Sequence, residues 1–312
     1  MERKGKEIIT ASWVSIAGNS VLAVMKLVVG FVAGSFAVIA DGIDSASDIV
    51  GAIVTLIAAR VIAKPPNAKF AYGYVKADTL ASKILSMFIF LAGAQLAIAT
   101  IGKIISGTPT PVPRMLAIYF MAVSVIGKVA LNLYLNRVGS RHRSKMLITL
   151  GKNMRNDIVI SVGVIVGLGL SQILDSSIID KVIALLISAF IMVEAIRIFM
   201  KTNTELMDGI NDPELYERLF QAIQKVEGAY NPHRTRARKI GSKYMINLDV
   251  EVDPTLSVKE AHHIAQNVER MIKKEIEHVY DVMVHIEPYG NEEQGEKFGL
   301  AASDFTSNEK SS

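Results

Sequence analysis

Two aspartates, Asp44 and Asp48, lie one helical turn apart inside a long apolar stretch of the chain, residues 36–57. A carboxylate is costly in hydrocarbon, so ionisable residues at membrane depth generally mark a functional site. The spacing of i and i+4 places both side chains on one face of a helix. Such a pair is typical of a site for cations.

A second pair with the same spacing, Asn153 and Asp157, lies in another apolar stretch. At about 1.5 Å of rise per residue, counted from the ends of their predicted spans, both pairs arrive near the middle of the bilayer. We therefore expect four oxygen-bearing side chains to converge. Three of them are carboxylates, which can neutralise and coordinate a divalent cation.

A competing interpretation gives Asp157 an ordinary ion-pair role. In that interpretation Asp157 pairs with a neighbouring or intramembrane charge, while Asp41 and Asp44 face a water-filled cleft. The charges in question are Arg155, Lys26, Lys83, Lys128 and Glu194. Two independent pairs at matching depth arise by chance less often than one isolated charge does. This favours the cation site.

The elements that must position these residues are membrane spans. Apolar residues make up 50% of the chain, and a helix of about 20 residues crosses about 30 Å of hydrocarbon. Turn-forming residues separate the apolar stretches. We predict six spans, at residues 8–33, 36–63, 79–105, 112–137, 146–173 and 178–201.

Lysine and arginine accumulate on one side of these spans, which predicts that both termini are cytoplasmic. The protein is expected to be a multi-pass protein of the cell membrane, and the sequence pI of 9.0 reflects this bias rather than binding to nucleic acid. The first apolar run is too long for a cleaved signal peptide. The lysines and arginines predicted to lie on the cytoplasmic side of the spans are Arg3, Lys4, Lys6, Lys64, Lys69, Lys76, Arg137, Arg141, Arg143 and Lys145.

The chain has no cysteine, which excludes disulfides and thiolate metal ligands. Oxygen and imidazole remain as ligands. No Walker loop or nucleotide domain is visible, which argues against an ATP-driven pump. No re-entrant filter sequence indicates a channel. We expect a secondary transporter that is not an enzyme and binds no nucleotide.

Composition changes to a soluble pattern after the first domain, residues 1–202. Residues 203–290 read as helix, strand, strand, helix, strand, with strands at 245–253 and 279–287. Ser257 and Glu260 form a capping box for a helix over 257–274. We predict an α+β domain of the αββαβ, ferredoxin-like type, and a disordered tail over 291–312.

Taken together, the residues resemble the cation diffusion facilitator family over residues 8–288. The likeness rests on six spans and on five motifs. These are the run 40–48, the pair Asn153 and Asp157 in span five, Tyr72-Gly-Tyr-Val-Lys-Ala-Asp78, Glu260-Ala-His262 and Val284-His-Ile-Glu-Pro288. The resemblance implies a homodimeric antiporter that exports a divalent transition metal from the cytoplasm in exchange for protons, by alternating access. Its soluble domain is expected to be of the metallochaperone type.

The resemblance carries the transport site onto Asp44, Asp48, Asn153 and Asp157. Zinc-type members usually have histidine where this chain has Asn153, and asparagine there is associated with manganese transport. The predicted spans contain no histidine, and carboxylate, amide and water oxygens suit Mn²⁺ better than Zn²⁺. We expect Mn²⁺ export. The alternatives are Zn²⁺, Fe²⁺ or Co²⁺ export, or a non-transporting metal sensor or scaffold.

The resemblance also implies a cytoplasmic metal site. Its ligands are expected to be His233, which we place before the first strand, Asp249, His262, His285 and Glu287. The competing interpretation is that these are solvated polar faces of strands and a helix. His263 and His278 are expected to be surface residues.

Two further features lie near the membrane boundary. Lys76 and Asp208 match a charge pair that joins the two parts of family members at the dimer centre; the alternative is a positive-inside lysine and a helix-capping aspartate. A second family site, in the loop between spans two and three, needs Asp and His. The corresponding positions are Asn67, Phe70 and Tyr74, so we predict that this site is missing.

Overall fold

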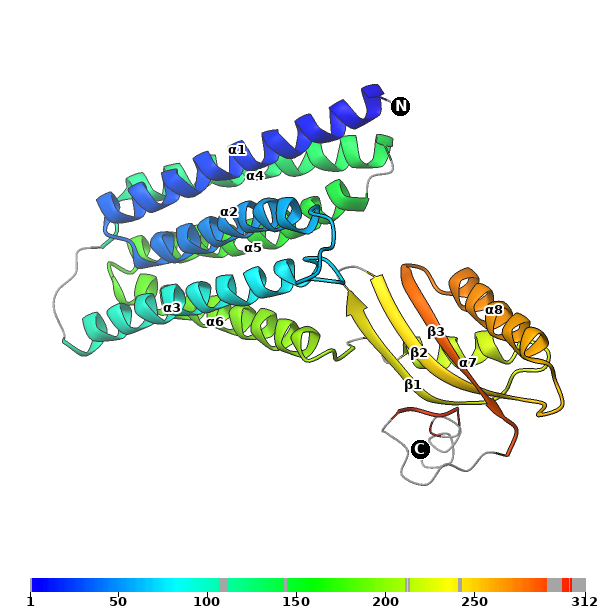
Figure 1. Ribbon diagram of the computed structural model, residues 1–312. Coiled ribbons are helices and arrows are strands. Elements are labelled where there is room, and N and C mark those ends of the chain that lie inside the picture. The colour runs from blue at the N-terminus through cyan, green and yellow to red at the C-terminus, as the bar shows by residue number, and fades with distance from the viewer. Residues whose placement is uncertain are drawn as a thin grey trace. The chain divides into compact units, whose positions relative to one another are not determined.

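The structure is a computed structural model of the 312-residue chain. It describes residues 2–106, 112–142, 145–210, 212, 214–240, 243–290, 299–302 and 304. The chain divides into two compact units (Figure 1). The first comprises residues 1–58 and 81–199, and the second comprises residues 59–80 and 200–312.

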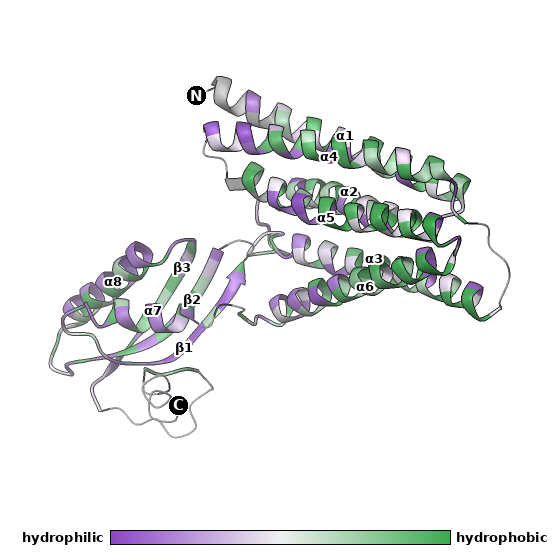
Figure 2. Ribbon diagram, turned by 180° about the vertical axis from the view of Figure 1, so that it is seen from behind, coloured by the Kyte–Doolittle hydropathy of each residue, from purple (hydrophilic) through white to green (hydrophobic). Residues whose placement is uncertain are grey.

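Six long helices in the described residues are apolar and long enough to cross a membrane, which confirms the predicted number of spans. Hydrophobic residues dominate these helices (Figure 2), and many of their large apolar side chains are exposed, such as Phe31, Phe88 and Ile126. A helix exposes apolar side chains in this way when its surroundings are lipid rather than water. The helices are α1 (Glu2–Ala33), α2 (Phe36–Ile62), α3 (Ala77–Ile105), α4 (Met115–His142), α5 (Lys145–Ile173) and α6 (Ile178–Leu206).

Small residues allow the first two helices to approach closely. A Cβ atom on Gly30 would lie 2.9 Å from the backbone nitrogen of Ile39, and one on Gly42 would lie 2.8 Å from a methyl carbon of Leu27. Close approach at small residues is characteristic of helix packing in membranes. Helix α4 packs against both α1 and α5. The helices that carry the two predicted pairs, α2 and α5, thereby share one bundle.

The second unit contains α7 (Glu214–Ile223), β1 (Tyr230–Ile240), β2 (Lys243–Val252), α8 (Val258–Glu275) and β3 (Val279–Pro288), in the predicted order αββαβ. The strand order is β1-β2-β3, with β1 and β2 antiparallel and β2 and β3 parallel. Helix α8 packs against β3 and α7. One hydrophobic core joins the two helices to the sheet, and it includes Leu215, Leu219, Ile223, Ile246, Leu248, Val268 and Ile272.

Local signals place several of these elements well. Ser257 caps α8, and its side chain and backbone donate hydrogen bonds to Glu260, which lower the pKa of that carboxyl. The position of His233 before the first strand is wrong, because β1 begins at Tyr230. Of the predicted tail, residues 299–302 and 304 are described.

Candidate metal centres

Three of the four predicted transport ligands line one cavity of about 120 Å³ in the first unit. Asp48 comes from α2, whereas Asn153 and Asp157 come from adjacent turns of α5. The other polar groups of the lining, Ser15 and Asn19, come from α1. The cavity therefore offers oxygen ligands from three helices, which matches the expected donor chemistry for a hard divalent ion.

Asp44, the fourth predicted ligand, is close to this cavity without lining it. Its carboxyl lies within electrostatic range of Asp157 and Asp41, and of the ammonium groups of Lys26 and Lys128. Asp48 in turn lies within hydrogen-bonding range of Asp157. The structure thus brings the two predicted pairs together, and three carboxylates gather around one small space.

Lys128 of α4, which is not one of the four predicted ligands, is in direct contact with Asp157. Its Nζ lies 2.9 Å from Oδ2 of Asp157 and donates to Oγ of Ser45 over 3.2 Å. The Lys128 side chain is 2% exposed, and that of Asp157 is 15% exposed. A buried ammonium needs a compensating charge, and Asp157 supplies it here.

A second buried pair lies beside the first. Lys26 Nζ is 2.7 Å from Oδ2 of Asp41, and both side chains are fully buried. The same ammonium donates to Oγ of Ser161 and of Ser45, and Ser161 donates to Asp41. Both charged groups of this pair have buried partners, and neither residue lines the cavity.

The competing interpretation of the sequence is right in one respect and wrong in another. Among the candidate partners of Asp157, Lys128 does form the ion pair. Asp41 does not face a cleft, because it is completely buried against Lys26. Lys128 appears in the sequence only as one of several intramembrane charges, and nothing in its spacing distinguishes it from Lys26.

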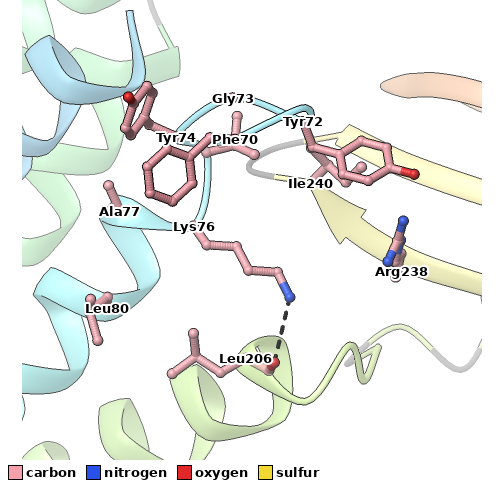
Figure 3. A pocket seen from close by; sticks show the side chains of 11 residues that line it. Phe70, Tyr72, Gly73, Tyr74, Lys76, Ala77, Leu80, Leu206, Arg238 and Ile240 are labelled. Atoms are coloured by element: carbon pink, nitrogen blue, oxygen red, sulfur yellow. Dashed lines mark hydrogen bonds between the residues drawn. The ribbon is translucent and has the colours of Figure 1, made fainter. Parts of the chain in front are cut away.

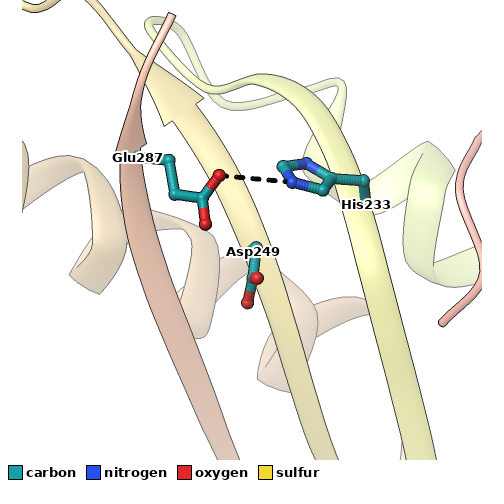
Figure 4. A group of neighbouring side chains, drawn as sticks. All are labelled: His233, Asp249 and Glu287. Atoms are coloured by element: carbon teal, nitrogen blue, oxygen red, sulfur yellow. Dashed lines mark ion pairs between the residues drawn. The ribbon is translucent and has the colours of Figure 1, made fainter. Parts of the chain in front are cut away.

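In the second unit, His233, Asp249 and Glu287 form a compact cluster (Figure 4). One potential ligand atom from each lies within 4.8 Å of the others. Strand register explains the arrangement: His233 of β1 pairs with Asp249 of β2, which pairs with His285 of β3. Glu287 follows two residues later on β3, and because strand side chains alternate it shares a face with His285.

The histidine of this cluster is oriented as a metal ligand would be. Its Nδ1 lies 2.8 Å from the carbonyl oxygen of Asn231, and because a carbonyl only accepts, Nδ1 must carry the proton. In the neutral ring, Nε2 then presents a lone pair toward Glu287, whose Oε2 is 3.4 Å away. A backbone carbonyl that fixes the tautomer is a common second partner of ligating histidines.

Arg234 forms ion pairs with both carboxylates of the cluster. Its Nη1 lies 2.8 Å from Oδ2 of Asp249 and 3.4 Å from Oε1 of Glu287. Arg234 and Asn231 both have left-handed backbones, with φ of 46° and 42°, and the β1–β2 register shifts on both sides of His233. These irregularities aim two consecutive side chains, His233 and Arg234, at the same carboxylates.

The remaining predicted cytoplasmic ligands lie outside the compact cluster. His285 Nε2 is 3.5 Å from Glu287, but its side chain is 64% exposed. His262 lies on α8, where its ring is 3.1 Å from the amide of Gln266. His263 and His278 are exposed, as expected. One chain therefore brings three of the five predicted ligands together and a fourth to the edge.

The predicted charge pair at the membrane boundary forms in the second unit. Lys76 Nζ lies 2.6 Å from Oδ1 of Asp208 and also donates to the carbonyl of Leu206. Lys76 also lines a cavity of about 500 Å³, whose other lining residues are mainly apolar and aromatic (Figure 3). Arg238 reaches both Asp208 and the ring of Tyr72. Both members of the pair are half-exposed, so the pair alone contributes little stability.

The loop that carries Asn67, Phe70 and Tyr74 is held by its own side chains. The Asn67 amide donates to the Tyr74 hydroxyl, and Oδ1 of Asn67 accepts from the backbone of Lys69 and Phe70. The rings of Phe70 and Tyr74 are 4.7 Å apart. These three residues act as a turn and an aromatic contact.

Comparison with known proteins places both parts of the chain in one family. Residues 12–207 match the family model of the cation efflux transmembrane domain. Residues 211–289 match that of the cation efflux protein, cytoplasmic domain. Together the two matches cover nearly all of the described chain.

Full-length relatives cover most of the chain. The uncharacterized transporter YdbO of Bacillus subtilis is 33% identical over 86% of this chain and 91% of its own. The manganese efflux system protein MneS of the same organism is 32% identical, over 88% and 93% respectively. The magnetosome protein MamB of Paramagnetospirillum magneticum is 26% identical, over 88% and 93%.

A solved structure covers the C-terminal part only. The metal-bound C-terminal domain of the CzcD transporter from Thermotoga maritima is 38% identical over 26% of this chain and 93% of its own, with a TM-score of 0.25. The family matches to both parts, together with relatives of nearly full length, decide the classification. This chain belongs to the cation efflux family, the cation diffusion facilitators, and is a multi-pass membrane protein of metal efflux.

Proposed function

We propose that the chain is a homodimeric, proton-coupled antiporter that exports Mn²⁺ from the cytoplasm across the cell membrane by alternating access. In this proposal both termini lie in the cytoplasm. Residues 1–202 carry the transport site, residues 203–290 form a cytoplasmic metal-binding domain, and residues 291–312 form a tail.

The observation that carries this proposal is the cavity shared by Asp48, Asn153 and Asp157, with Asp44 beside it. All of its candidate side-chain ligands are oxygens. Mn²⁺ accepts carboxylate, amide and water oxygens readily, whereas Zn²⁺ sites in proteins favour imidazole and thiolate. Two relatives carry names that agree with this choice, the manganese efflux system proteins MneS and MneP of Bacillus subtilis.

Proton coupling follows from the same carboxylates. A carboxylate charge is unfavourable in a low-dielectric surrounding, so an ammonium group, a proton or a metal ion must neutralise it. Asp157 has Lys128 for this purpose, which leaves Asp44 and Asp48 to be neutralised by protons or by the metal ion. An ion that enters the cavity displaces protons from the carboxylates, and protons from the opposite side displace the ion. Binding at the same groups makes the two cargoes mutually exclusive, which is what an antiporter needs.

The cytoplasmic cluster is proposed to bind metal through His233, Asp249 and Glu287, with His285 and His262 as further ligands. Metal there stabilises the domain by mass action. Because this cluster includes imidazole, it accepts softer ions than the membrane cavity does. A sensor or scaffold would need only this cluster, so the membrane cavity argues for transport.

The test is metal uptake into vesicles that contain the purified full chain, with a proton gradient imposed. We expect Mn²⁺ to move fastest in a panel that includes Zn²⁺, Fe²⁺ and Co²⁺, and uptake to stop when the gradient is collapsed. Faster transport of Zn²⁺, Fe²⁺ or Co²⁺ would correct the substrate. No transport of any ion by the folded protein would favour the sensor or scaffold.

A further inference from the structure

The membrane cavity, which is lined by Asp48, Asn153 and Asp157, has a basic side chain beside its candidate ligands, that of Lys128. Its ammonium holds Oδ2 of Asp157, 2.9 Å away, and Asp157 also lines the cavity. A divalent ion in the cavity would therefore meet a carboxylate that already has a cation. The basic side chain and the cargo have the same electrostatic partner.

Charge counting shows what this arrangement does. The group contains four carboxylates, Asp41, Asp44, Asp48 and Asp157, and two ammonium groups, Lys26 and Lys128. When every group is charged, four negative and two positive charges give a net charge of −2. One divalent cation cancels this net charge. Without Lys128 the empty group would carry one more uncompensated negative charge in a low-dielectric region, which is unfavourable.

The two lysines have different roles in this count. Lys26 and Asp41 are fully buried, linked through Ser161, and away from the cavity. Lys128 neutralises Asp157, which lines the cavity, whereas Asp41 does not line it. Both ammonium groups donate to Ser45, so Lys128 keeps a buried acceptor when Asp157 turns to another cation.

We propose, building on the function above, that Lys128 is a tethered cation that competes with the transported metal for Asp157 and so sets the affinity of the transport site. In the empty site Lys128 neutralises Asp157. An entering divalent ion takes over Asp157, and Lys128 remains bound to Ser45. When the ion leaves, Lys128 returns to Asp157, which lowers the affinity enough for release.

The experiment is Mn²⁺ binding to the purified full chain, measured from the electron paramagnetic resonance signal of free Mn²⁺. The transport-site component is the part of the binding that is lost in folded Asp157→Asn protein. Removing the competing charge with Lys128→Met should increase the Mn²⁺ affinity of this component about tenfold. At a protein-like dielectric constant, the interaction of two unit charges a few ångströms apart corresponds to at least this change in affinity. Efflux by this variant should slow, because release becomes harder.

Two further variants control this result. Lys128→Arg keeps the charge and can hold Asp157 through two N–H groups, so Mn²⁺ affinity should fall, by about threefold or more. Lys26→Met removes an equally buried lysine whose aspartate does not face the cavity, and should tighten binding less than Lys128→Met. If Lys128→Met does not assemble, Lys128→Arg carries the test alone.

The outcomes separate the two proposals. If Asp157→Asn removes no Mn²⁺ binding, the transport site itself is wrong. If Asp157→Asn removes binding, but a folded Lys128→Met does not tighten it and Lys128→Arg does not weaken it, then Lys128 is only a structural counter-ion. The transport site would survive that result.

Discussion

The two candidate metal centres solve the same electrostatic problem with different elements. In the membrane cavity, Lys128 holds Asp157, and the ligands come from helices that the bundle brings together. In the cytoplasmic cluster, Arg234 holds Asp249 and Glu287, and strand register supplies the ligands. Each centre thus contains a basic side chain on the carboxylates that a metal would use.

The difference lies in the donor atoms and in the geometry of the basic group. The cavity offers only oxygens, whereas the cluster adds the imidazole of His233. Lysine is a point charge on a flexible stem, whereas arginine has a planar fork that matches carboxylates. We therefore expect the cavity to exchange its cation more easily than the cluster, as transport requires and a regulatory or structural site does not.

The largest effect should come from removing the charge pair of the cavity. Asp157→Asn alone leaves Lys128 buried without its partner, which costs about 3–5 kcal/mol of stability for a buried pair broken on one side. Asp157→Asn combined with Lys128→Met removes both charges. We expect this double variant to remain a folded protein and to lose Mn²⁺ transport to background in vesicles.

Asp249→Asn is the matched change in the cytoplasmic cluster. It should leave Mn²⁺ transport measurable in the same vesicles, because Asp249 is no part of the cavity. Equal loss of transport in the two variants would contradict the division of roles between the centres.

Selectivity should change with the donor type in the cavity. Asn153→His places a nitrogen donor where the native chain has an amide oxygen, and should shift the ratio of Zn²⁺ to Mn²⁺ transport roughly tenfold toward Zn²⁺. Competition between the two ions in vesicle uptake measures this ratio. Asn153→Gln, which keeps an amide, is the control. An unchanged ratio in Asn153→His would place selectivity elsewhere.

The smallest effect concerns the cluster on the strands. Arg234→Gln removes the guanidinium from Asp249 and Glu287, so metal should bind the cluster more tightly and raise the unfolding temperature of the cytoplasmic domain further. A fivefold gain in affinity corresponds to about 1 kcal/mol when metal is in excess. Calorimetry with and without Zn²⁺ measures the shift. Arg236→Gln, a nearby arginine of β1, is the control, and equal shifts in both variants would refute the competition.

The helices and the second and third strands could be predicted from the sequence because each carries a local signal. Spans are long apolar runs, and β2 and β3 alternate or run apolar between clear turns. Strand β1 has neither signal. It includes Pro232 and five basic residues, and lies at the edge of the sheet with register shifts. Its arginines alternate with the small residues Thr235 and Ala237 instead of with large apolar residues, so the usual signal of a half-buried strand is weak.

Most of the residues that gather at the two candidate centres could be named from the sequence, but the basic side chains that contact them could not be singled out. In the sequence Lys128 is one of several possible partners of Asp157, and Arg234 is not among the predicted ligands or partners. Spacing of i and i+4 fixes which face of a helix carries Asp44 and Asp48. Which lysine reaches Asp157 depends on how α4 packs against α5, which no local pattern encodes. Arg234 reaches the cluster only because its backbone and that of Asn231 are left-handed. These contacts are tertiary.

The contact between the C-terminal segment and β1 has a practical consequence for work on the soluble domain. Leu300 and Thr235 exchange two backbone hydrogen bonds, and a Cβ on Gly299 would clash with the backbone of Arg234. The segment thus covers part of the outer edge of β1, next to His233. An exposed strand edge can pair with other molecules and promote aggregation. A recombinant fragment that stops at residue 290 uncovers this edge, whereas one that continues through residue 304 retains its native cover.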